Sequence, residues 1–448
     1  MPRPRGSFKA LPNYRLHKPS GRAVVTLAGR DHYLGAYGSK ESRDLYDRVV
    51  GEWLASGRVQ TPDAAPTGAT AGITVVEVIA AFWRHAQTYY RRPDGTTTKE
   101  LRNLKNALRP LKRLYGPTPA LAFGPVALRA VRDEMVRLGW CRTHINRQVN
   151  RIRHVFKWAA GRELVPSSVY HALQAVEGLK AGRSEAKESK PVKPVAWSYV
   201  EAIEPYVSRQ VWAMVKLQWI TGMRSGEVTR MTTSAIETGD GQWVYRPAAH
   251  KTQHHGHLRE VYMGEQCKQI LATFLKPDFA AFIFSPADAE CERREEQHEA
   301  RKTPPSCGNT PGSNRARRPR RSPGDRYTVE AYCKAIHAAC DAAFPPPDEL
   351  ARQRVSARGR KAKKGTRWET SAEWKSRLGK EMWARLRRWR ETHRWHPHQL
   401  RHSAGTRLRK EFGVEAAQVI LGHKTLSVTE IYAEKNVEAA RQIMGKVG

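Results

Sequence analysis

The chain of 448 residues lacks a Cys-x-x-Cys pair, a long apolar run and an internal repeat. Its six cysteines are scattered, and nothing near the N-terminus resembles a secretory signal peptide, so we expect reduced thiols in a cytoplasmic protein. The longest apolar stretches, such as Val211–Ile220, are interrupted by polar residues and fall short of the ~20 residues that a membrane-spanning helix needs. These absences argue against a secreted protein and against a membrane protein.

Acidic residues are also scarce. Asp and Glu number 43 against 78 Lys and Arg, which gives a formal net charge of +35. This excess exceeds what solubility requires and indicates a polyanionic partner. The thirteen Trp residues and a hydrophobic content of 40% favour a folded protein over a disordered basic chain.

The first 56 residues predict a small module. Two β-like runs, Arg22–Leu27 and His32–Leu34, precede a helical pattern at Glu41–Ala55, which indicates a three-stranded sheet with one helix. Such a module either binds DNA or is an accessory cap that makes no DNA contact. Residues 57–72 are rich in Ala, Gly, Pro and Thr and are expected to form a linker.

Residues 73–180 predict a helical domain. Thr74 and Glu77 form a capping-box pattern, and apolar residues then recur at helical spacing. Further helices are expected at Thr98–Tyr115, Pro125–Leu138 and Arg142–Ala160. Their polar faces carry charges of nearly one sign, which fits either ordinary solvated surface or contact with a DNA backbone.

A second linker is expected at residues 181–194, which are charged, contain proline and show no periodicity. Residues 195–448 then form a third domain, and the predicted fold class is mainly α with small β-sheets (α+β). Residues 286–325 hold many Arg, Pro and Ser and no apolar periodicity, so we expect an exposed basic insertion. A helix is expected to resume at Thr328–Phe344, followed by a basic, Trp-containing and largely helical stretch at 351–394.

Within the third domain, Arg224 and Glu227 lie three residues apart after a helix that ends at Thr221-Gly222. An isolated pair of this kind is more often a surface ion pair than a functional one. Lys251 lies near the turn of an expected hairpin, where a lysine is usually only solvated.

The C-terminal region adds four further candidates. His398 and Arg401 are three residues apart on an expected helix, so both can point at one object, whereas His402 faces elsewhere and is expected to be structural. His423 follows a glycine suited to a helix end, and Tyr432 lies on or near another short helix. A lone tyrosine there would ordinarily serve packing.

These residue types make chemical sense around one phosphodiester. Two guanidiniums donate planar, bidentate hydrogen bonds to nonbridging oxygens, where charge must be stabilised as phosphorus becomes five-coordinate. Lysine can protonate an alkoxide leaving group, and histidine donates or accepts protons near neutral pH. Tyrosine is a credible covalent nucleophile once neighbouring cations activate its phenol.

The order and local contexts of six residues resemble the tyrosine recombinase (phage integrase) family: Arg224 (TGMRSGE), Lys251 (HKT), His398 and Arg401 (HQLRH), and His423 and Tyr432 (LGHKTLSVTEIY). The resemblance covers residues 73–440 and extends in outline to the N-terminal module. It implies a catalytic domain of the recombinase fold at 195–448, a helical core-binding domain at 73–180 and an arm-type module at 1–56.

The resemblance also implies a mechanism. Tyr432 would attack the scissile phosphate to give a 3′-phosphotyrosine and a free 5′-hydroxyl, while Arg224 and Arg401 bind the phosphate and Lys251 protonates the departing oxygen. His398 would assist proton transfer and His423 would hydrogen-bond the phosphate, with Glu227 and His402 in supporting roles. No cofactor or metal would be needed.

The partners implied are double-stranded DNA, three further copies of the chain in a homotetramer on paired DNA sites, and DNA-bending accessory proteins, in a cytoplasmic setting on the nucleoid. Two features depart from the family: Tyr432 lacks a histidine two residues beyond it, and the segment from Lys251 to His398 is long. Two alternatives share the resemblance, a type IB topoisomerase and a non-catalytic DNA-binding protein on the same fold. The second predicts loss of at least one of the six residues, and all six are present.

Overall fold

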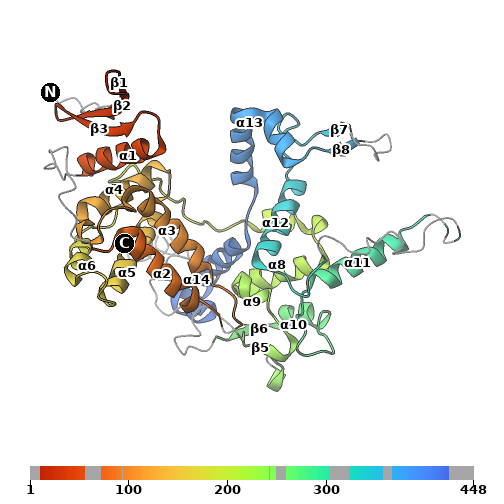
Figure 1. Ribbon diagram of the computed structural model, residues 1–448. Helices are drawn as coiled ribbons and strands as arrows, with labels where there is room; N and C mark the ends of the chain where they lie inside the picture. The colour runs from red at the N-terminus through yellow and green to blue at the C-terminus, as the bar shows by residue number, and fades with distance from the viewer. Residues whose placement is uncertain are drawn as a thin grey trace, which may run out of the picture. The chain divides into compact units, whose positions relative to one another are not determined.

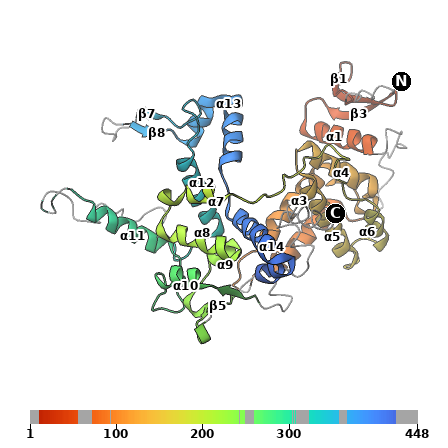
Figure 2. The same ribbon diagram turned by 180° about the vertical axis from the view of Figure 1, so that it is seen from behind.

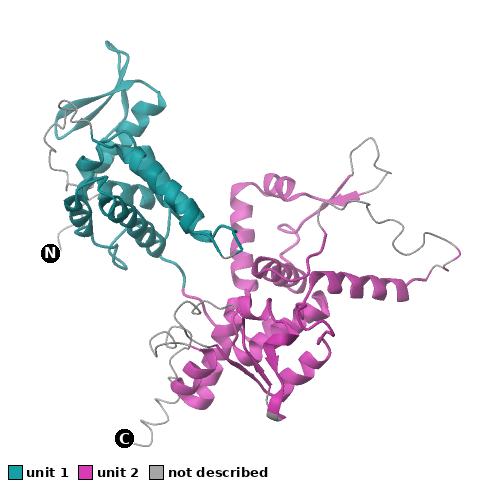
Figure 3. Ribbon diagram, turned by 60° about the horizontal axis from the view of Figure 1, so that its bottom comes forward, with its two compact units in different colours: residues 1–190 teal, residues 191–448 magenta. Residues whose placement is uncertain are grey.

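A computed structural model describes most of the chain as two compact units, residues 1–190 and 191–448 (Figure 3). The described residues are 11–55, 72–92, 94–241, 243–248, 259–302, 304, 306, 322–356 and 366–422.

The N-terminal module of the first unit is an antiparallel sheet in the order β1-β2-β3 covered by one helix (Figure 1). Its elements are β1 (Arg15–His17), β2 (Arg22–Leu27), β3 (Arg30–Ala36) and α1 (Lys40–Ala55). Alternate apolar residues of β2 and β3 pack with Val50 of α1 to form a small core. The expected three-stranded sheet with one helix is confirmed.

A helical bundle follows in the first unit. Its helices are α2 (Val75–Tyr89), α3 (Lys99–Tyr115), α4 (Pro125–Arg137), α5 (Arg142–Ala160) and α6 (Ser167–Gln174). The helix α2 begins where the capping box predicts, because the Glu77 carboxylate accepts the Thr74 backbone N–H at 2.8 Å. The apolar stripes of the helices meet in one core that includes Phe82, Leu111 and Phe156.

The segment expected to be the second linker is held in place for part of its length. It contains no helix or strand, but the Arg142 backbone N–H donates to the Lys187 carbonyl at 2.8 Å, and the Arg142 side chain pairs with Glu188 at 2.6 Å. Ala186 is buried against the bundle. Residues up to Lys190 therefore belong to the first unit.

The second unit is mainly helical and holds two small antiparallel sheets. Its elements before the long insertion are α7 (Trp197–Glu201), α8 (Arg209–Thr221), α9 (Ser225–Val228), β4 (Ile236–Glu237), β5 (Trp243–Tyr245), β6 (Val261–Met263) and α10 (Glu265–Ala272). The insertion begins with α11 (Pro286–Glu299), and after it come α12 (Val329–Ala343), β7 (Arg354–Ser356), β8 (Thr366–Trp368), α13 (Ser371–His393) and α14 (Pro397–Leu421). The apolar helix α8 lies at the centre of the core and packs along α14.

Two parts of this unit differ from the sequence expectation. The start of the expected basic insertion forms the helix α11, which has no buried residue and carries six acidic residues against two arginines. Its N-terminus is stabilised by the Ser285 hydroxyl, which accepts the backbone N–H groups of Ala287 and Asp288. The stretch after α12 contains the unexpected strands β7 and β8, and α13 is kinked at Gly379, whose φ is +63°.

The observed architecture confirms the predicted fold class, mainly helical with small antiparallel sheets. No helix in the described ranges combines the length and the apolar character required to cross a membrane. The five cysteines that the structure describes are unpaired.

A cluster of ion pairs joins α1 to the helical bundle. The Arg113 guanidinium of α3 donates to Asp47 at 2.6 Å and Asp44 at 3.1 Å on α1, and to Glu134 of α4 at 2.5 Å. Arg137 also pairs with Glu134 at 2.7 Å, and the Glu134 side chain is only 8% exposed. One guanidinium thus holds together three helices and links the N-terminal module to the bundle.

We predict that Arg113→Ala destabilises the first unit by about 2 kcal/mol, because three carboxylates lose their shared cation and one of them is largely buried. Arg109→Ala is the matched control, since Arg109 is exposed on the same helix, and it should change stability by less than about 0.5 kcal/mol. The measurement is urea unfolding of the full-length protein. Equal midpoints for the two variants would show that the cluster does not stabilise the fold.

Candidate functional site

The turn between α8 and α9 presents Arg224. The helix α8 ends at Gly222, whose φ is +65°, and a side-chain carbon there would lie 2.5 Å from Leu421 of α14. Only glycine fits both the left-handed backbone and this close approach. Two residues later, the Arg224 backbone N–H and its Nη1 both donate to the Glu227 carboxylate, at 2.9 and 2.8 Å.

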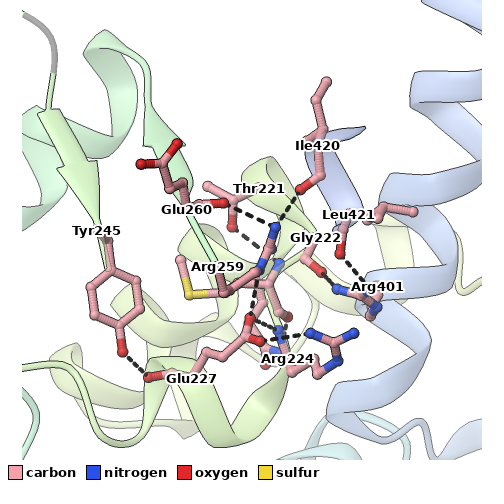
Figure 4. Close-up of polar contacts among 12 residues, drawn as sticks. Thr221, Gly222, Arg224, Glu227, Tyr245, Arg259, Glu260, Arg401, Ile420 and Leu421 are labelled. Carbon is pink, nitrogen blue, oxygen red and sulfur yellow. Dashed lines mark hydrogen bonds and ion pairs between the residues drawn. The ribbon is translucent and has the colours of Figure 1, made fainter. Parts of the chain in front are cut away.

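Glu227 is almost completely buried, with a side chain 3% exposed. Burial opposes its ionisation, but the charges of Arg259 and Arg224 and the bonds from Arg224 outweigh burial and lower its pKa. The Tyr245 hydroxyl of β5 donates to the Glu227 backbone carbonyl at 2.9 Å, which holds the sheet against α9 (Figure 4). This Arg-x-x-Glu pair is therefore not a surface ion pair.

Arg401 is fully buried on α14. Its Nη1 donates to the Gly222 carbonyl at 2.8 Å and its Nη2 to the Leu421 carbonyl at 2.7 Å (Figure 4). These carbonyls lie at the C-terminal ends of α8 and α14, where helix dipoles concentrate partial negative charge. The guanidinium thereby joins the turn that holds Arg224 to the end of α14.

A second arginine of α14 acts on α8 in the same way. Arg407 donates from Nη2 to the carbonyls of Trp219 and Ile220, at 2.9 and 3.2 Å, and its guanidinium lies 5.3 Å from the centre of the Trp219 ring. The last turn of α8 is therefore held by two arginines of one neighbouring helix.

His398 and His402 lie one turn apart on α14, with ring centres 5.2 Å apart and nearly perpendicular planes. His398 is half-buried and His402 is 5% exposed. Burial, and then the positive charges of His398, His396 and Arg401, lower the pKa of His402 to about 4. This imidazole is neutral near pH 7, which is consistent with the structural role expected for it.

Three of the predicted site residues lie outside the described residues: Lys251, His423 and Tyr432. Their places along the chain still follow from their neighbours. Lys251 belongs to the connection between the paired strands β5 and β6, and His423 directly follows Gly422 at the end of α14. The structure brings Arg224, Glu227 and Arg401 together around Gly222.

Arg259 is a component of this site that the sequence did not reveal. Its side chain is 5% exposed, and its Nε lies 3.7 Å from the Glu227 carboxylate. Its Nη1 donates to the Ile420 carbonyl at 3.0 Å, beside the carbonyl that Arg401 binds (Figure 4). No pattern in the sequence signals this, because an arginine just before a short strand is ordinarily exposed.

The arrangement gathers three guanidiniums and one carboxylate around the ends of two helices. Such a concentration of fixed positive charge suits an anionic group, and the half-exposed imidazole of His398 adds a group that can move a proton. Within the described ranges, no three His, Cys, Asp or Glu side chains gather closely enough to hold a metal ion.

Residues 326–439 match the model of the Phage integrase family. The match covers the segment that contains His398, Arg401, His423 and Tyr432, but not Arg224 or Lys251. No match was found among proteins of curated function.

Solved structures of similar fold include a lambda integrase dimer bound to a COC′ core site, with a TM-score of 0.50 and 13% identity over 96% of this chain and 97% of that one. Another is the Tn1549 transposon integrase in complex with transposon right-end DNA, with a TM-score of 0.49 and 13% identity over 84% and 99%. At 13% identity, the likeness to the lambda integrase dimer shows the fold alone.

We predict that Arg259→Gln lowers the free energy of unfolding of the second unit by about 3 kcal/mol, because it leaves the Glu227 carboxylate buried beside one cation instead of two. Arg230→Gln is the control, since Arg230 is exposed and only two residues beyond α9. The measurement is chemical denaturation followed by Trp fluorescence. If both variants unfold at the wild-type midpoint, Arg259 does not hold the site together.

Proposed function

We propose, from the membership of this chain in the tyrosine recombinase (phage integrase) family, that it is a site-specific DNA recombinase that cleaves and rejoins DNA through a 3′-phosphotyrosine intermediate. The observation that carries the proposal is the family match over residues 326–439. Within that match, Arg401 joins the end of α14 to the turn that presents Arg224. The proposed phosphate site lies at this junction.

In the cleavage step, the Tyr432 oxygen attacks the scissile phosphorus as its proton leaves with the help of His398. A bond forms between the phenolic oxygen and phosphorus, the bond from phosphorus to the 5′-oxygen breaks, and Lys251 supplies the proton for that oxygen. Rejoining reverses the step with a 5′-hydroxyl of the partner strand. Because the covalent link preserves the energy of the phosphodiester, ATP is not consumed.

Arg224 and Arg401 stabilise the charge that develops on the nonbridging oxygens, and His423 adds a hydrogen bond. Glu227 supports this by holding Arg224 through two bonds. Arg401 has five N–H groups and uses one from each Nη on the carbonyls of Gly222 and Leu421. Because Arg401 is fully buried, a phosphate reaches it only after the chain around it rearranges.

The proposed partner is double-stranded DNA, which suits the net charge of +35. We assign arm-site binding to residues 1–56, core-site binding to 73–180 and catalysis to 195–448. Four protomers would act on paired sites, with DNA-bending proteins as accessory factors, in the cytoplasm on the nucleoid.

We predict that Tyr432→Phe abolishes covalent protein–DNA adducts and leaves DNA affinity within about twofold, because only the nucleophilic oxygen is removed. The substrate is a nicked DNA that traps the cleaved complex, and the readout is a denaturing gel. Tyr262→Phe is the control, since Tyr262 is half-exposed on β6 and should form adducts at the normal rate. An adduct that survives Tyr432→Phe would refute the assignment.

Substitution of the two arginines proposed to bind phosphate should affect the stability of the fold to different degrees. Arg224→Ala is expected to slow cleavage by about 10²-fold or more. It should also lower stability, because the buried Glu227 keeps only Arg259 as a charged partner, but by less than Arg401→Ala, since Arg224 is 24% exposed. Arg401→Ala should also destabilise the fold, since it leaves two buried carbonyls without their donor. Adduct formation rates and thermal melting of both variants test this. Near-normal cleavage by folded Arg224→Ala would count against the phosphate role.

A relaxation assay separates the alternatives. A type IB topoisomerase would relax supercoiled DNA that lacks a specific site rapidly and as a monomer, whereas a recombinase requires its site. A non-catalytic DNA-binding protein would form no covalent adduct with any DNA.

A further inference from the structure

Residues 350–356 and 366–393 form a small module with a core of its own, inserted between α12 and α14. We call it the hairpin module. Leu350, Trp374, Leu378 and Leu386 pack together apart from the main core of the unit, and the Trp374 indole donates to the Leu350 carbonyl at 3.0 Å. In Figures 1 and 2, α13 and the β7–β8 pair project away from α8 and α10.

The base of α13 is firmly attached to the rest of the unit. Arg390 and Arg394 both pair with Asp341 of α12, at 3.1 and 2.5 Å. The Trp389 indole donates to the Phe344 carbonyl. The C-terminal end of the module is therefore fixed to α12 and the main core of the second unit.

The β7–β8 pair carries an exposed aromatic and a cation side by side. Arg354 and Trp368 are cross-strand partners, with the guanidinium 5.2 Å from the centre of the indole ring. Trp368 is 55% exposed, although burial of a Trp side chain is strongly favourable. All three residues of β8 are exposed, so within the described structure nothing covers this two-stranded ribbon.

The second half of α13 presents a row of cations. Lys380, Arg387 and Arg388 are spaced by seven and eight residues and are all exposed, which places them on one side of the helix. None of them forms an ion pair with a described residue. By contrast, Arg377 and Arg385 of the same helix are paired with Glu369 and Glu349.

The excess of positive charge belongs to this helix in particular. The helix α13 carries seven Lys and Arg against three Glu, whereas α11, which has no buried residue, carries two Arg against six acidic residues. On α11, Arg293 and Arg294 both pair with Glu290. A generally basic composition does not explain this difference between two helices of one unit.

We propose that the hairpin module is a second binding surface for duplex DNA, separate from the phosphate site at Gly222. Lys380, Arg387 and Arg388 contact backbone phosphates, and Arg354 with Trp368 contacts the backbone alongside. Unpaired arginines and lysines on one face, next to an exposed aromatic, match the polyanionic and partly apolar surface of a sugar-phosphate backbone. The inference concerns binding only, so it holds whether or not the chain cleaves DNA.

The test compares two pairs of adjacent arginines. The double variant R387Q/R388Q removes two unpaired cations from the proposed surface, and R293Q/R294Q removes two paired cations from α11. Each changes the net charge equally on an exposed helix. Binding of the full-length protein to a long duplex is measured over a range of salt concentrations, and the logarithm of the affinity is plotted against the logarithm of salt.

For R387Q/R388Q, the slope of this plot should fall in magnitude by about 1.8, because each lost phosphate contact removes roughly 0.9. For R293Q/R294Q the change should stay below about 0.5 on the same scale. Arg354→Gln, a third variant on the ribbon, should lower the slope by about 0.9. Slopes of R387Q/R388Q and Arg354→Gln equal to the wild type would overturn the proposal.

Two further readouts separate the possible causes. If the hairpin module instead contacts an acidic surface of another copy of the chain, R387Q/R388Q will change the oligomeric state in light scattering and leave the slope unchanged, which also overturns the proposal. Failure of the wild-type protein to form covalent adducts would refute the proposed recombinase activity, and the difference in slope would still decide this inference.

Discussion

The second unit depends on arginine side chains that bind the carbonyls at the ends of two helices. Arg401 bridges the last carbonyls of α8 and α14, and Arg259 binds the carbonyl next to one of these. A helix end buried without partners would be costly, and a cation there also opposes the partial charge of the helix dipole. The turn that presents Arg224 and the point where the chain leaves α14 toward His423 and Tyr432 are thereby tied to each other.

The contacts between arginines and helix-end carbonyls also limit how these arginines can bind a substrate. A guanidinium that stabilises the fold through backbone carbonyls has fewer N–H groups for a substrate, and its burial keeps solvent and DNA away. Arg224 differs, because Glu227 holds it while a quarter of its side chain stays exposed. Arg259 in turn keeps the buried Glu227 ionised. The site therefore combines one arginine that stays partly exposed with two buried ones that mainly define its shape, and the proposed chemistry requires Arg401 to bind both the backbone carbonyls and the phosphate.

Local patterns predicted much of the fold because local physics determines it. The capping pair Thr74 and Glu77 marks the start of α2, and the alternation in Arg22–Leu27 marks β2. Arg224 and Glu227 were recognised as a pair, but their burial depends on β5, β6 and α14, which are distant in sequence. Arg259 could not be found for the same reason. The acidic helix α11 was not predicted, because the residues after it are strongly basic and the whole segment was expected to be an irregular insertion. The pairing of β7 with β8 was not predicted either, because the residues between them carry no strong hairpin signal.

The central claim is that a tyrosine at the end of this constrained chain becomes linked to DNA. It is tested most directly by trapping the protein on a cleavable DNA, digesting both components and identifying the joined peptide and nucleotide by mass spectrometry. The account predicts one linkage, between the Tyr432 oxygen and the 3′-phosphate of the cleaved strand. A nucleotide joined to any other side chain, or a linkage through a 5′-phosphate, would contradict it.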